Sequence, residues 1–158
     1  MRKTKRTAAG TVLTDLILDL FRLNNRIVSA GDRLVAELGL TSARWQILGT
    51  IAAAERPQPV AWLARDMGAH RQNVQRIVND LAKEDLVAFA PNPHHRRAPL
   101  VVLTDEGKQA FEAAMHRQAP WVNMLSEGLQ VADIETTHKV LTALRRKLEG
   151  DKDAEEQE

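Results

Sequence analysis

Side chains of the kind that read DNA bases are concentrated in one segment of this chain, Ala69–Val87. One apolar face at helical spacing runs through the segment, made of Val74, Ile77, Val78 and Leu81. The positions between them carry Arg71, Gln72, Asn73, Gln75, Arg76 and Asn79. Arginine can pair with guanine, and asparagine or glutamine with adenine, at base edges in the major groove. An ordinary amphipathic helix with a solvated polar face has the same pattern, so the surroundings of the segment must decide.

The segments on either side of this polar helix complete a DNA-binding motif. Val60–Met67 predicts a short helix that Gly68 ends, and the polar helix follows within three residues, as in a helix-turn-helix. Two β-strands are expected next, at Leu86–Ala90 and Leu100–Thr104, joined by the turn-rich tip NPHHRRAP. A helix-turn-helix followed by such a hairpin is a winged helix.

The N-terminal part of the chain predicts a long helix with more apolar surface than one buried face requires. Leucine and isoleucine recur every three or four residues over 12–38, and Gly39 follows as the stop signal. Leu18 and Phe21 lie outside that apolar stripe, which indicates a second packing partner. Thr41 is placed to cap the next helix, SARWQILGTIAAA.

Two further helices are expected after the hairpin. Thr104 can cap the first of these helices. Pro120 should kink this helix, and Gly128 should end it. The second covers about Val131–Leu148 and also has an apolar side. The apolar faces at both ends of the chain are buried most simply if they pack together and against a second copy of the chain. We therefore expect a dimer with twofold symmetry, its termini interlocked at the centre.

The predicted fold is mainly α with a small β-hairpin wing: a winged helix-turn-helix with N- and C-terminal dimerisation helices. We expect a basic flexible arm at 1–11, a helical dimerisation region formed by 12–38 and 105–148, a winged helix-turn-helix DNA-binding domain at 41–104, and an acidic flexible tail at 149–158.

Composition and charge exclude several classes of function. The formal net charge of the 158 residues is only +1, but between Arg56 and Ala98 seven lysines and arginines face four acids, which suits a phosphate-facing surface. The absence of cysteine excludes disulfides, thiolate zinc sites and sensing by thiol oxidation. No membrane-spanning run or signal sequence is evident, so the expected location is the cytoplasm. No catalytic motif is present, and neither an enzyme nor a cofactor is expected.

The order of elements resembles the multiple-antibiotic-resistance regulator (MarR) family of dimeric winged-helix transcription factors over nearly the whole chain, roughly Val12 to Leu148. The resemblance is strongest in two segments, LARDMGAHRQNVQRIVNDLAKEDLV and the wing HRRAPLVVLTDEG. The family shows a wing arginine before an apolar strand and then Leu-Thr-x-x-Gly, and this chain has Arg97, Leu103, Thr104 and Gly107 in those positions.

The resemblance implies a homodimeric, sequence-specific DNA-binding regulator, a repressor released by a small aromatic or lipophilic ligand. The polar helix would begin near His70 and read the major groove, and Arg97 would enter a minor groove, whose negative potential favours an inserted arginine. Arg65, His95 and Arg96 would contact phosphates. Three residues depart from the family pattern: His95 replaces an aspartate that braces the wing arginine, and His70 replaces a capping serine or threonine. Asp85 replaces a glycine at a position where a left-handed backbone is expected, which aspartate tolerates less well.

Several alternatives stay open at this stage. The same winged helix could bind a protein partner without DNA, although the helix over 69–84 offers few exposed apolar anchors. A metal at His94 and His95 is disfavoured, because adjacent histidines in a turn do not chelate one ion easily. His116 and His138 are expected in the core or a dimer interface. Trp45, Trp62 and Trp121 are expected in the core, or one of them in a ligand cavity.

Overall fold

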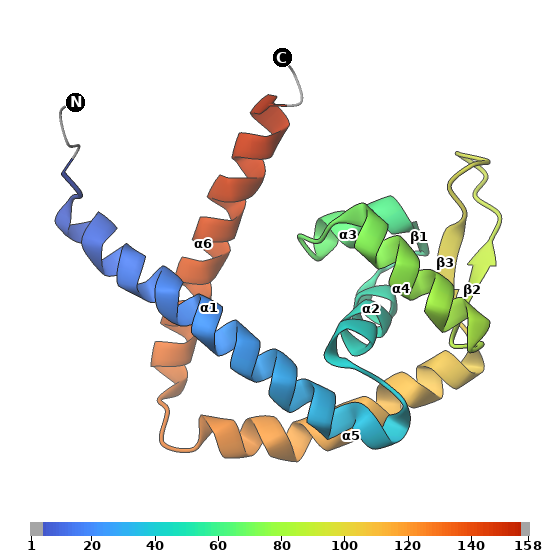
Figure 1. Cartoon of the computed structure of the whole chain (residues 1–158), viewed down its shortest axis with the longest axis horizontal. Helices are drawn as coiled ribbons and strands as arrows, with labels where there is room; N and C mark the ends of the chain where they lie inside the picture. The colour runs from blue at the N-terminus through green and yellow to red at the C-terminus, as the bar shows by residue number, and fades with distance from the viewer. Residues whose placement is uncertain (1–4, 156–158) are drawn as a thin grey trace. The chain divides into compact units, whose positions relative to one another are not determined.

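A small antiparallel sheet interrupts an otherwise helical chain (Figure 1). The computed structural model describes residues 5–155, and side chains over 5–150. The elements are α1 (Ala8–Val35), a 3-10 turn (Ala36–Leu38), α2 (Ser42–Ala53), β1 (Gln58–Pro59), α3 (Val60–Asp66), α4 (Arg71–Lys83), β2 (Val87–Ala90), β3 (Leu100–Leu103), α5 (Asp105–Ser126) and α6 (Val131–Glu155). The described residues up to Ala119 and those from Pro120 onward form two compact units, and the first contains the complete winged helix. The predicted fold class is confirmed.

The sheet has the order β1-β3-β2, with β3 in the centre. β2 and β3 are the expected hairpin, in register with Phe89 opposite Val101. β1 was not expected: it is two residues long, and Gln58 pairs with the other edge of Val101. A two-residue strand that includes a proline has no readable periodicity, and Pro59 is tolerated because it lies on the edge of the sheet.

The core of the winged helix is built where α2, α3, α4 and β3 meet. The apolar stripe predicted for α4 is buried as expected, and Ile47, Leu48, Leu63 and Val101 are fully buried around it. Burying a side chain of this size contributes roughly 1.5–3 kcal/mol to folding. The apolar face of α4 is therefore committed to the core, which leaves its polar face outward.

α2 is attached to α1 by a buried serine. The Ser42 hydroxyl donates to the Val28 carbonyl at 2.8 Å, and the Asp32 carboxylate accepts from the Ser42 backbone N–H at 2.7 Å. Gly31 lies directly beneath this serine, and a side chain there would overlap the hydroxyl. The small residue at 31 thus allows the long helix and the winged helix to pack closely.

A second close approach holds α4, the wing strands and α5 together. The Thr104 hydroxyl donates to the Asp85 carbonyl at 2.5 Å and accepts from the Gly107 backbone N–H at 2.9 Å. Thr104 therefore caps α5, as predicted, and also ties α5 to the turn that ends α4. A Cβ at Gly107 would overlap the Leu86 carbonyl oxygen.

The other predicted stops and caps can also be checked. Gly39 adopts φ 69°, and Thr41 accepts from the Arg44 backbone N–H at 3.3 Å, so the turn between α1 and α2 is as expected. His70 occupies the N-cap of α4 without a side-chain hydrogen bond. Asp85 has φ 58° and is the only residue other than glycine with a left-handed backbone in the described part of the chain. This is the conformation expected at the position where the family has a glycine.

The structure differs from the expected boundaries at both ends of the chain. α1 begins at Ala8 because Thr7 caps it, accepting from the Gly10 backbone N–H at 3.0 Å, so the last residues of the expected arm are helical. Residues 1–4 of that arm lie outside the described residues. α6 continues to Glu155, through most of the expected tail. None of the described helices is long and apolar enough to cross a membrane.

One expectation about the core was wrong. Trp62 is 55% exposed on α3, because the helix turns Leu63 and Ala64 inward and Trp62 outward. His116 and His138 are exposed in the single chain, so neither lies in its core, and their place in a dimer interface stays a prediction. Trp45 does pack against the core, and Trp121 is half-buried.

We predict that Gly107→Ala lowers the free energy of unfolding by about 2–3 kcal/mol, because the new methyl group would overlap the Leu86 carbonyl. The matched control is Gly150→Ala in α6, where a Cβ meets nothing within 4 Å and helix propensity should raise stability by up to about 1 kcal/mol. Urea unfolding at one protein concentration measures both. Equal stability of the two variants would contradict the close approach at Gly107.

Candidate nucleic-acid interface

The exposed face of α4 carries the polar residues that the sequence singled out. Gln75 is half-buried, and the others are exposed: Arg71, Gln72, Asn73, Arg76 and Asn79. Two pairs preorganise this face. The Arg76 guanidinium donates to the Asn73 side-chain oxygen at 2.9 Å, and the Gln75 amide donates to the Asn79 side-chain oxygen at 2.9 Å. Asn73 and Arg76 therefore form one unit, so that changing Asn73 also releases the guanidinium.

The wing is the hairpin of β2, β3 and the tip at 91–99, and one asparagine shapes its tip. The Asn92 side-chain amide donates to the Ala98 carbonyl at 2.8 Å, and its side-chain oxygen accepts from the His94 backbone N–H at 3.0 Å. The side chains of His94, His95, Arg96 and Arg97 remain exposed around this closed tip. Sequence reasoning missed Asn92, although asparagine at the start of a turn is a known signal.

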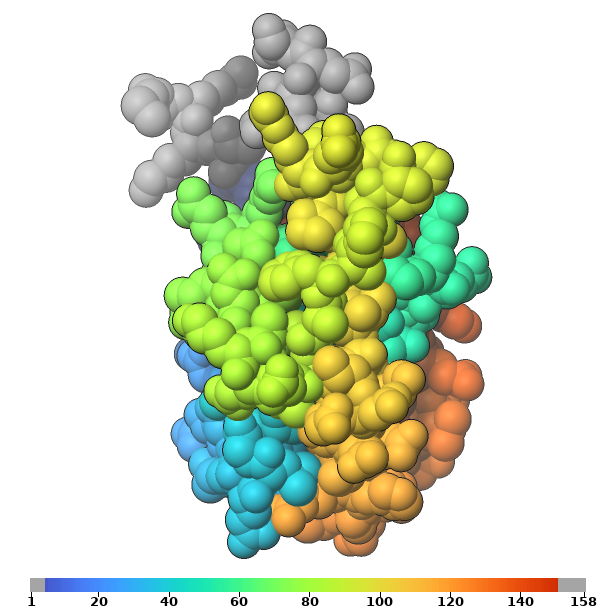
Figure 2. Space-filling model, turned by 90° about the vertical axis from the view of Figure 1, so that its right-hand side faces the viewer, coloured from blue at the N-terminus to red at the C-terminus, as the bar shows by residue number. Residues whose placement is uncertain are grey.

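A cavity of about 780 Å³ lies between the wing and the start of α3, and we name it the wing cavity. Arg71 of α4 and Arg97 of the wing both line it, so two residues that are 26 positions apart in the sequence share one site. Trp62 and Arg56 line it as well, and neither was among the predicted site residues. In the view of Figure 2 the yellow-green wing lies above the green of α4.

Arg65, His70 and Arg96 are exposed but are not among the residues that line the wing cavity. His95 does line it, together with His94. Among the described residues, no group of three or more histidines and acids could hold a metal ion.

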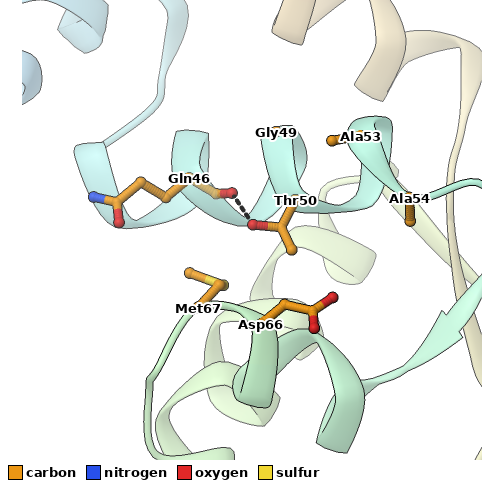
Figure 3. Close-up of a pocket in the computed structure, with 7 residues that line it drawn as sticks. All are labelled: Gln46, Gly49, Thr50, Ala53, Ala54, Asp66 and Met67. Atoms are coloured by element: carbon orange, nitrogen blue, oxygen red, sulfur yellow. Dashed lines mark hydrogen bonds between the residues drawn. The ribbon is translucent and has the colours of Figure 1, made fainter. Parts of the chain in front are cut away.

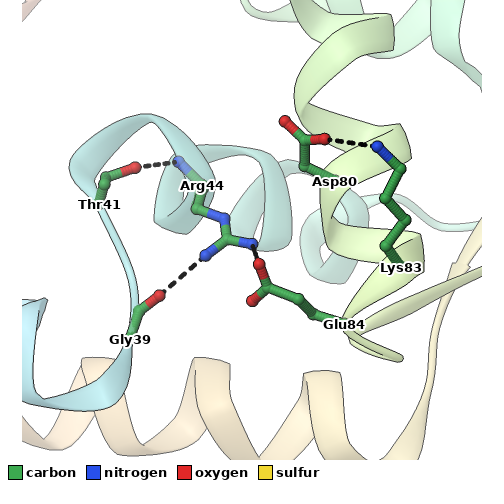
Figure 4. Close-up of polar contacts among 6 residues, drawn as sticks. All are labelled: Gly39, Thr41, Arg44, Asp80, Lys83 and Glu84. Carbon is green, nitrogen blue, oxygen red and sulfur yellow. Dashed lines mark hydrogen bonds and ion pairs between the residues drawn. The ribbon is translucent and has the colours of Figure 1, made fainter.

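α4 is held at its C-terminal end by a partly buried arginine (Figure 4). The Arg44 side chain, 16% exposed, pairs with the Glu84 carboxylate at 2.5 Å and donates to the Gly39 carbonyl at 2.9 Å. The neighbouring Lys83–Asp80 pair lies in solvent and spans one turn of α4 only. Arg44 therefore joins three segments, the α1–α2 turn, α2 and the end of α4.

A second cavity, of about 490 Å³, lies between α2 and α3 and has a different character (Figure 3). Gly49, Ala53 and Ala54 leave one wall without large side chains, and the Thr50 hydroxyl is turned back onto the Gln46 carbonyl at 2.8 Å. Asp66 and Met67 face them from the other wall. Asp66 brings a carboxylate to this cavity and no cation lines it, so the cavity is unsuited to binding phosphates.

Comparison with known proteins identifies relatives of the chain. A model of the MarR family matches residues 38–98, which covers most of the winged helix. An uncharacterised protein of Mycobacterium tuberculosis is 35% identical over 126 residues, 80% of this chain and 87% of that protein. The transcriptional activatory protein BadR of Rhodopseudomonas palustris is 29% identical over 99 residues, 61% of this chain and 57% of BadR.

A solved structure extends the similarity to the whole fold. The crystal structure of CouR from Rhodococcus jostii, bound to p-coumaroyl-CoA, matches with a TM-score of 0.74. The match covers 82% of this chain and 91% of CouR at 20% sequence identity, so it shows a shared fold and no more.

We predict that Arg44→Ala lowers the free energy of unfolding by about 1–2 kcal/mol, because a charged hydrogen bond and a partly buried ion pair are lost together. Lys83→Ala is the matched control and should change stability by less than about 0.5 kcal/mol, because its ion pair is solvated. Denaturant titration followed by circular dichroism compares them. A loss for Arg44→Ala no larger than for Lys83→Ala would show that this contact does not hold α4.

Proposed function

The chain belongs to the MarR family of DNA-binding transcription regulators, and from that premise we propose that it is a homodimeric, sequence-specific repressor released by a small molecule. Members of this family are DNA-binding proteins and not enzymes. One observation carries the proposal: the polar face of α4 and the arginines of the wing are exposed on the same winged helix, and Arg71 and Arg97 line one cavity.

In this proposal the two elements have different tasks. Gln72, Asn73 and Arg76 select bases in the major groove, with Arg71, Gln75 and Asn79 beside them. Arg97 enters the adjacent minor groove, and phosphates are contacted by His70, by Arg65 on α3, and by His95 and Arg96 on the wing. Phosphate contacts supply affinity that falls with salt, and base contacts supply the choice of sequence.

The proposed dimer is supported by apolar surface that the single chain leaves exposed. On α1 this surface includes Val12, Leu18, Phe21 and Leu23. α5, α6 and the turn between them add Val122, Met124, Leu125, Leu129, Val131, Ile134 and Leu148. Large exposed apolar side chains gathered on a helix are typical of an interface. Helices 12–38 and 105–148 would pair around a twofold axis, so that two copies of α4 meet half-sites about one helical turn apart.

The proposed response to a ligand requires a molecule that binds two shapes of the dimer unequally. CouR was solved with p-coumaroyl-CoA, which supports a small aromatic or lipophilic effector for a protein of this fold. Binding would favour a dimer whose two copies of α4 no longer match the spacing of the major groove. BadR, a relative of this chain, is named an activatory protein. A DNA-bound regulator can repress or activate according to where its operator lies relative to the promoter.

We predict that selection from random duplex DNA at about physiological salt enriches an inverted repeat, because a twofold dimer presents the same helix twice. A salt titration on the enriched duplex should then give a steep fall in affinity. A folded dimer that enriches no sequence would instead support a winged helix that binds a protein partner.

We predict different effects from the two elements of the interface. Gln72→Ala should relax preference at one base pair of each half-site, and Asn73→Ala at the bases read by Asn73 and Arg76 together, because these two side chains are paired. Each change should cost about 1–3 kcal/mol of discrimination. Arg97→Ala should weaken binding to every sequence. Selection profiles of the variants measure this, and unchanged profiles for both α4 variants would contradict the assignment of this face.

A further inference from the structure

We propose that the wing cavity holds the sugar–phosphate strand that separates the two DNA grooves, and that Trp62 is a positioning residue packed against a deoxyribose of that strand. This inference rests on the proposed function. It adds two residues, Trp62 and Arg56, that neither the sequence pattern nor the comparisons assign to DNA.

On any duplex, a major groove and the neighbouring minor groove are divided by one sugar–phosphate strand. If α4 lies in the first and the wing in the second, that strand must pass between these two elements. The cavity lies between the wing and the elements that lead into α4, and its walls include Arg71 from the start of α4 and Arg97 from the wing tip.

The wing cavity is lined by positively charged side chains. Three guanidinium groups line the cavity and come from three separate segments: Arg56 from the loop before β1, Arg71 from α4 and Arg97 from the wing. His94 and His95 add imidazoles, and no carboxylate is among the lining residues of this described region. A cavity with cations on several sides and no acid suits a chain of phosphates, which can meet more than one guanidinium at once.

Trp62 is exposed although tryptophan is usually well buried. Its indole is not part of the core and is 55% exposed in the first turn of α3. Pro57 and Pro59 line the same wall, so an apolar surface faces the cavity between the arginines. The hydrocarbon of a deoxyribose can pack on such a surface, and the indole N–H can donate to a phosphate oxygen.

Gln58 forms part of the same wall, and its side-chain oxygen is the only buried side-chain polar atom without a hydrogen-bond partner in the described part of the chain. The sugar–phosphate backbone of DNA has no hydrogen-bond donor for this oxygen, but protein–DNA interfaces carry ordered water that can donate to it. The bases of a duplex are stacked away from this wall, so Trp62 and Arg56 should add affinity without choosing sequence.

The test uses the full chain with two variants, Trp62→Ala and Arg56→Gln, on the enriched operator and on an unrelated duplex. Trp62→Ala should weaken binding to both duplexes by about five- to tenfold, which is the lower part of the range for an aromatic side chain stacked on a base, and leave the slope of log affinity against log salt unchanged. Arg56→Gln should reduce that slope by about 1, because one phosphate contact is lost. Trp62→Phe should restore most of the affinity.

Two controls separate a local effect from a general one. Lys83→Gln removes an exposed lysine at the C-terminal end of α4 that is paired with Asp80 and does not line the wing cavity, and it should leave affinity and salt slope as in the unchanged protein. A duplex with uncharged methylphosphonates at the linkages between the α4 groove and the wing groove should bind the unchanged protein more weakly. The same substitution should cost Arg56→Gln less, because the two changes remove one interaction.

The outcomes distinguish this inference from the proposed function. A protein that binds no duplex refutes both. Steep, sequence-specific binding that Trp62→Ala and Arg56→Gln leave unchanged refutes the inference alone.

Discussion

The contact of Thr104 and Gly107 with the turn after α4 is the constraint on which the rest of the winged helix depends. One hydroxyl there accepts from the first turn of α5 and donates to the Asp85 carbonyl, and α5 approaches the backbone at Leu86 too closely for any side chain at Gly107. α4 ends, the wing begins and α5 starts within this one junction. The angle between α4 and the wing is thus set by close backbone contacts and by one short side chain, that of Thr104.

Two further contacts attach the same unit to the long helix α1. Arg44 links the end of α4 to the α1–α2 turn, and buried Ser42 links the start of α2 to α1 above Gly31. Arg117 of α5 adds an ion pair to Glu37 at 2.9 Å. α1 carries much of the exposed apolar surface. In the proposed dimer, a change in how two copies of α1 pack would reach α4 through these short contacts, and this would couple effector binding to DNA binding.

The candidate interface was predictable where a pattern lies within one element. The stripe on α4 separates its buried and exposed faces by spacing alone, and the structure buries Val74, Ile77, Val78 and Leu81 as that spacing requires. The paired state of Asn73 and Arg76 was not predictable, because it depends on rotamers. Trp62 was assigned to the core because tryptophan is highly buried on average. On a seven-residue helix, periodicity is too short to decide which side faces inward.

The sequence by itself determined the order of elements, the caps at Thr41 and Thr104, the left-handed turn at Asp85 and the membership of a DNA-binding family, because these depend on neighbours in the chain. Only the tertiary structure decided that β1 adds a third strand, and that Arg56, Trp62, Arg71 and Arg97 share one cavity. Those residues are brought together by the packing of α3, α4 and the wing on a common core. No local pattern records which surfaces such packing leaves facing one another.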